Sequence, residues 1–180
     1  MSGESDTTAA FGLGGTTGWF VGGALGGAIG AIAFGIVMVL LEPGVLEAAI
    51  PAIYGLEPAG PLGWGIHIAH GIVLGLLFGL LVTRPWILGV LRTDVETDAL
   101  SRTGIVIRLI GAGLVFGLTV WAILPLIVLP VWVSTLGVGE QTFSSVAAGS
   151  LLGHALFGVV LGAVFAAVVD LRDRTPETPL

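Results

Sequence analysis

Apolar and polar residues form long separate blocks along this chain. Four blocks are almost wholly apolar and long enough to cross about 30 Å of hydrocarbon, which takes roughly 20 residues of α-helix. They cover residues 18–41, 63–83, 104–133 and 144–169. The third block contains Pro125 and Pro130, which predict a kink or break toward its far end because proline has no backbone N–H to donate. The pattern predicts an all-α protein with four membrane spans.

Composition supports one membrane domain over residues 1–180. The chain is 55% hydrophobic and only 10% charged, whereas soluble domains carry about 25% charged residues. Cysteine is absent, which removes disulfides and thiolate metal sites. The formal net charge is −6 and there is no lysine. We therefore expect the lipid bilayer, and not nucleic acid, as a partner.

The arginines predict the orientation in the cell membrane. They lie on or at the edges of the connection between the second and third spans and after the fourth span, whereas the other two connections hold glutamates and no basic residue. The arginines are Arg84, Arg92, Arg102, Arg108, Arg172 and Arg174, and the acidic residues are Glu42, Glu47, Glu57 and Glu140. The positive-inside rule then places both termini and the middle connection in the cytoplasm. Within that connection, Thr93 to Glu96 fits a capping box that opens a short interfacial helix.

The second and fourth spans share a pattern. From His67 the sequence reads HIAHGIVLGLLF, and from His154 it reads HALFGVVLGAVF. The matched pairs are His67 with His154, Gly71 with Gly158, Gly75 with Gly162, and Phe78 with Phe165. The first and third spans also align, Phe34 with Phe116 and Pro43 with Pro125. We therefore predict a transmembrane four-helix bundle of two tandem helical hairpins, 18–83 and 104–169, related as a parallel repeat.

Small residues recur at four-residue steps along the spans, and residues at that spacing share a helix face. The glycines that we expect at helix–helix contacts are Gly71, Gly75, Gly158, Gly162, Gly22 and Gly26. Such glycines allow helix backbones to approach closely within a membrane. His67 and His154 lie on the same ridges, with His70 three residues further on, so the sequence predicts that the histidines point into the bundle.

Histidines inside a bilayer are candidates for a functional site. We expect a histidine-lined site inside the bundle toward its extracytoplasmic end, able to bind haem b, a transition metal or another small ligand. Two histidines on facing helices could hold a haem iron, and His67, His70 and His154 could offer three nitrogens to a metal. The sequence identifies no particular ligand.

Two other functions stay open. The histidines can be packing contacts in a structural or accessory subunit, or the chain can be a small transporter that acts as an oligomer. A homo-oligomer and a larger membrane complex both fit the glycine-rich first span. No catalytic motif is present at a useful spacing, so we expect no enzyme.

The motifs GIHIAHGIVLGLLFG and SLLGHALFGVVLGAVFA carry a resemblance. With them, nearly all of the chain resembles a group of small four-span integral membrane proteins of extreme halophiles, whose members are often automatically labelled "histidine kinase". The resemblance implies four spans and no established activity. A sensor kinase requires an ATP-binding domain, whereas only a short polar tail follows Val169, so we expect no kinase activity.

A reporter fused after Leu180 tests the orientation. Green fluorescent protein at this position is expected to fluoresce and alkaline phosphatase to be inactive, because every arginine lies on the side predicted to be cytoplasmic. A phosphatase inserted after Glu57 is the control and should be active. Phosphatase activity at Leu180 would contradict the orientation with cytoplasmic termini.

Overall fold

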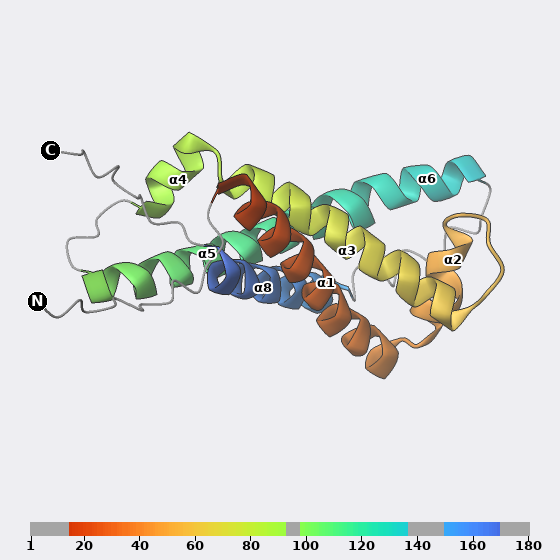
Figure 1. Ribbon diagram of the computed structural model, residues 1–180. Coiled ribbons are helices and arrows are strands. Elements are labelled where there is room, and N and C mark those ends of the chain that lie inside the picture. The colour runs from red at the N-terminus through yellow and green to blue at the C-terminus, as the bar shows by residue number, and fades with distance from the viewer. Residues whose placement is uncertain (1–14, 93–97, 137–149, 170–180) are drawn as a thin grey trace, which may run out of the picture.

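The computed structural model describes residues 15–92, 98–136 and 150–169. These residues are helical almost throughout, which confirms the all-α prediction (Figure 1). The elements are α1 (Gly15–Leu41), η1 (Val45–Ala49), α2 (Ile50–Ala52), α3 (Gly60–Val82), α4 (Pro85–Arg92), α5 (Asp98–Ile123), η2 (Leu124–Val128), α6 (Leu129–Leu136) and α8 (Leu151–Val168). The two η elements are π-helical.

Four helical stretches are long and apolar enough to cross a membrane, which confirms the predicted number of spans. They are Thr17–Leu41, Gly60–Val82, Thr103–Trp132 and Leu151–Val168. The predicted start of the fourth span, 144–149, lies outside the described residues, as does the predicted capping box at Thr93–Glu96. The chain is therefore a multi-pass helical membrane protein.

The third span is interrupted where its prolines predicted a break. α5 ends at Ile123, the π-helical η2 contains Pro125, and α6 continues the span from Leu129. Pro125 cannot donate a hydrogen bond to the carbonyl four residues earlier, so the α-helical ladder fails at this turn. A π-helical turn is a common way to absorb such a defect inside a helix.

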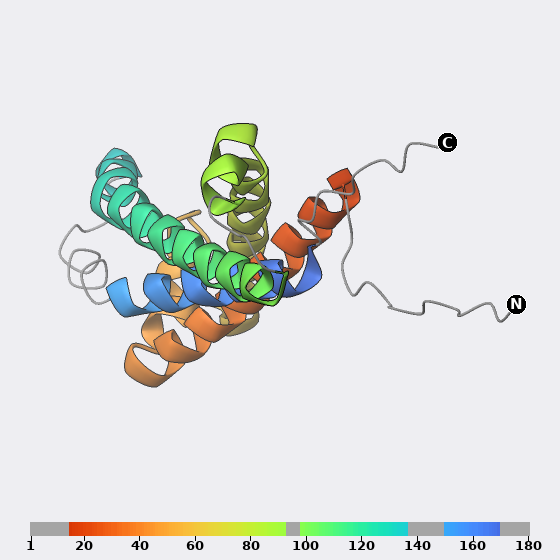
Figure 2. The same ribbon diagram turned by 90° about the vertical axis from the view of Figure 1, so that its left-hand side faces the viewer.

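Helix α1 lies in the middle of the bundle. It packs along both α3 and α8, and α5 packs along the other side of α8. In contrast, α3 and α5 make little contact with one another. The view in Figure 2 shows α8 beside α5 and α1. The four spans therefore pack in the order α3, α1, α8, α5.

Helix α1 can pack on two neighbours because its glycines form two ridges. Gly23 and Gly27 face α3, where an added Cβ would collide with the main chain of Gly75 and Gly71. The second ridge faces α8. There an added Cβ would lie 2.8 Å from Leu161 at Gly26, and 2.9 Å from Phe157 at Gly30. Adjacent residues of an α-helix are about 100° apart, so the paired glycines point one ridge at each neighbour.

The contact between α5 and α8 is also made by glycines. An added Cβ on Gly113 or on Gly158 would collide with the carbonyl of the other residue. Gly162 lies in the same way against Leu109. Because Gly71 matches Gly158, these contacts align Gly27 of α1 with Gly113 of α5. The Phe34–Phe116 match predicts an alignment of α1 with α5 that is shifted from this one by about one helical turn. The two phenylalanines also contact different positions, since Phe34 packs against His67 and His154 whereas Phe116 packs against Phe78.

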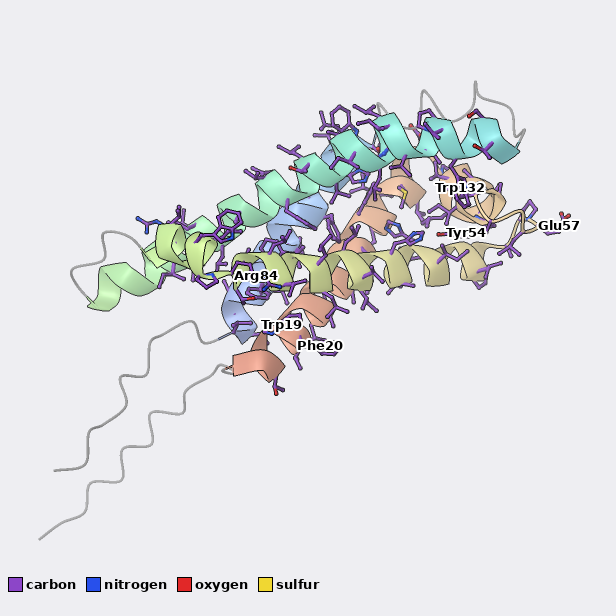
Figure 3. All side chains as sticks on the ribbon, turned by 90° about the horizontal axis from the view of Figure 1, so that it is seen from above. Trp19, Phe20, Tyr54, Glu57, Arg84 and Trp132 are labelled. Carbon is purple, nitrogen blue, oxygen red and sulfur yellow. The ribbon has the colours of Figure 1, made fainter. Side chains whose placement is uncertain are left out.

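The two ends of the bundle carry different side chains. Trp19, Phe20 and Arg84 lie at one end, and Tyr54, Glu57 and Trp132 lie at the other (Figure 3). At the first end, the short helix α4 buries Leu91. The Arg108 guanidinium of α5 donates a hydrogen bond to the carbonyl of Leu91 over 3.0 Å. This bond ties α4 to the bundle.

Substitution of Gly27 by alanine is expected to destabilise the protein by about 1–3 kcal/mol, because the new methyl group forces α1 and α3 apart. The free energy of unfolding in detergent measures the effect. Gly65→Ala is the matched control, since an added Cβ at Gly65 of α3 meets nothing within 4 Å. Equal losses in both variants would contradict the glycine contact.

Candidate functional site

The phenyl ring of Phe34, on α1, packs against two of the predicted site histidines. Phe34 is 6% exposed. Its ring centroid lies 5.2 Å from the His67 imidazole on α3 and 4.7 Å from the His154 imidazole on α8, both with edge-to-face geometry. His67 and His154 are half-buried. The structure therefore brings these two histidines to one junction of α1, α3 and α8.

Both imidazoles donate a hydrogen bond to the main chain. Nε2 of His67 donates to the carbonyl of Ala31 on α1 over 3.0 Å, so this bond joins two helices. Nδ1 of His154 donates to the carbonyl of Ser150, 2.9 Å away and four residues earlier in the chain. A neutral imidazole has one N–H, so each ring keeps its other nitrogen as a lone-pair acceptor.

His70 is directed elsewhere. It lies on an exposed part of α3, and its Nε2 is hydrogen bonded to the hydroxyl of Tyr54. Residues three apart on a helix differ by about 60° in direction. The sequence placed His70 near the face of His67, but this rotation carries it away from Phe34 and toward the connection between α1 and α3.

The three histidines consequently do not converge on one point. Among residues 15–92, 98–136 and 150–169, no group of three histidine, aspartate or glutamate side chains is placed to hold a metal ion. A haem iron bound by His67 and His154 would use Nδ1 of the first and Nε2 of the second, the two nitrogens left over from the main-chain bonds. Phe34 would have to leave its present contacts with both rings.

A recess opens next to this junction at the end of α1. It is a small cavity of about 30 Å³ that is partly open to solvent. The lining side chains come from α1, the start of η1 and the start of α8. They are Phe34, Val37, Met38, Leu41, Glu42, Val45, Ser150 and Gly153. Met38 is 8% exposed. The recess is therefore apolar except for a carboxylate and a hydroxyl.

Two further contacts hold the segment between α1 and α3 in place at this end of the bundle. The Trp132 indole of α6 donates to the carbonyl of Ile53 over 2.8 Å. Tyr54, the next residue, makes the bond to His70. Figure 3 shows Tyr54 and Trp132 at the same end of the molecule. The connection thus links α3 with the far part of the third span.

Comparison with known proteins gives no relative. The chain matches no protein-family model, no curated protein and no solved structure.

Sequence reasoning found the histidines but missed their neighbours. Phe34, the carbonyl of Ala31 and Tyr54 are distant from the histidines along the chain. One local signal was present. Gly153 precedes His154, and an added Cβ there would overlap the ring of Phe34. A glycine in a span indicates that a neighbouring helix approaches closely at that position.

A double-mutant cycle tests the Phe34–Gly153 contact. Gly153→Ala alone is expected to cost about 1–3 kcal/mol of unfolding free energy because the methyl group overlaps the phenyl ring. In a Phe34→Leu background the same change should cost less, with a coupling of at least about 0.5 kcal/mol. Additive losses would show that the two residues do not touch.

Proposed function

We propose that this chain is a non-catalytic structural or accessory subunit of the cell membrane, in which His67 and His154 stabilise the junction of α1, α3 and α8. One observation carries the proposal. Both imidazoles donate their N–H to a main-chain carbonyl, and their rings pack against the same buried phenylalanine, Phe34. The bond from His67 to Ala31 is the expected use of histidine as a polar contact between spans.

The energetics of a bilayer support this role. An N–H group without a partner in hydrocarbon costs several kcal/mol, so a half-buried imidazole needs an acceptor. The carbonyl of Ala31 lies inside α1, and a carbonyl oxygen has two lone pairs. It can accept from His67 as well as from its own helix. Bonds of this kind between spans contribute about 0.6 kcal/mol on average.

The proposed orientation has both termini in the cytoplasm. Arg84 and Arg108 belong to the end that carries α4, while Glu57 lies at the opposite end. This separation supports the positive-inside assignment. In this orientation the recess beside Phe34 opens on the extracytoplasmic side.

We further propose that the two hairpins are copies of one unit. The matched residues Phe78 and Phe165 contact one another edge to face, with ring centroids 5.4 Å apart. Residues related by a two-fold axis can touch only when they lie beside that axis. The packing departs from this symmetry, since α1 packs along α8 from Gly22 to Gly30 whereas α5 makes little contact with α3.

A ligand-binding role is the second candidate. The observation in its favour is that Nδ1 of His67 and Nε2 of His154 are not the nitrogens used in the main-chain bonds. Haem b or a transition metal could be bound there after movement of Phe34.

Two measurements separate the two candidates. One is an absorption spectrum of the purified protein before and after reduction, and the other is the free energy of unfolding of His67→Leu. In the structural role we expect no Soret band, and His67→Leu should lower the free energy of unfolding by about 0.6–1.7 kcal/mol because the bond to Ala31 is lost. His154→Leu should cost less, since its bond lies within one helix segment. A Soret band that disappears in His67→Leu, with stability unchanged, would overturn the structural role.

A further inference from the structure

The recess at the end of α1 has the composition of a small binding site. Its floor is apolar, with Phe34, Val37 and Met38 contributed by α1. Ligand pockets are typically apolar with a few placed polar groups. Here the polar residues of the described lining are Glu42 and Ser150. Glu42 does not belong to the histidine junction, whereas Phe34, Gly153 and Ser150 are shared by both.

The electrostatics of the recess favour a cation. Among the described residues of its lining, Glu42 is the one with a charged side chain. It also occupies the position directly after the last residue of α1, where the backbone carbonyls give a helix a partial negative charge. Pro43 follows and has no N–H to donate to the carbonyl of Val39. The Glu42 carboxylate and the C-terminal end of α1 are thus both negative, and both attract a cation.

The apolar part of the recess determines what kind of cation fits. Leu41 and Glu42 are exposed, while Phe34 and Met38 are buried. Ca²⁺ and Mg²⁺ take about six oxygen ligands, whereas Glu42 is the one carboxylate among the described lining residues. An organic ammonium can pair with the carboxylate and place its carbon chain against the methionine and the phenyl ring.

We propose that this recess binds a small organic ammonium, with the cationic head at Glu42 and the apolar tail against Met38 and Phe34. The site lies at the end of the spans, where such an amphipathic molecule is already concentrated at the membrane surface. Two kinds of ligand carry such an ammonium group. One is a free alkylammonium, and the other is a phospholipid with an ammonium headgroup. The inference does not depend on the structural role of the histidines.

The experiment uses the full chain in nanodiscs of phosphatidylglycerol. Binding of hexyltrimethylammonium is measured by titration calorimetry, with empty nanodiscs subtracted and hexanol as the uncharged probe. We expect saturable binding of the ammonium and weaker binding of hexanol. Glu42→Gln should reduce the affinity for the ammonium by about fivefold, the effect of an exposed charge pair, and Glu42→Lys should reduce it further. Neither should change the affinity for hexanol.

Glu47→Gln is the matched control. Glu47 is an exposed carboxylate on η1 that does not line the recess, so its loss removes the same charge and should leave binding unchanged. The melting temperature of each variant verifies that the fold is intact. No binding beyond that of empty nanodiscs, or equal losses from both glutamine variants, would overturn the proposal.

The source of the ammonium is distinguished by the lipid. If a phospholipid headgroup occupies the recess, nanodiscs with phosphatidylethanolamine should weaken binding of the probe, and native mass spectrometry should find this lipid retained on the protein but lost in Glu42→Gln. If the ligand is a free alkylammonium, the affinity for the probe should be the same in both lipids. Either result supports an ammonium site, and they assign it to different ligands.

Discussion

Contact between helix backbones at glycine holds this molecule together. Lipid tails are as apolar as leucine, so burial of apolar side chains gives little drive for one span to pack on another. Dispersion contacts have to replace it, and they are strongest where nothing separates the backbones. Gly27 against Gly71 and Gly113 against Gly158 provide such places. Because Phe34 and the histidines are positioned by these approaches, the site follows from the glycines.

The sequence was a good guide to the spans and a poor one to their arrangement. Long apolar runs predict helices in a membrane directly, and Pro125 predicted the interruption because a missing N–H acts locally. Which helices touch is a different matter. Spans that are apolar on every side show no face that must be buried. The central position of α1 depended on its two ridges, at Gly22 and Gly26 and at Gly23 and Gly27, of which the sequence analysis used only the first.

For the site, spacing along one helix was informative and contact across helices was not. The four-residue steps from His67 and His154 correctly indicated a helix-facing ridge, since both side chains meet Phe34 on α1. His70 turned toward Tyr54 because of a rotation that spacing alone leaves ambiguous. The partners Phe34 and Ala31 lie more than thirty residues from His67, and no local pattern pairs them.

The central place of α1 has a consequence for biogenesis. The ridge of Gly22, Gly26 and Gly30 finds its partner only in α8, the last span to leave the ribosome. The hairpin of α1 and α3 can assemble as soon as α3 is inserted, but that second ridge then borders lipid until synthesis has passed residue 168. During this interval the bare backbone of that ridge is not yet covered by α8, and its contacts form only when α8 displaces the surrounding lipid.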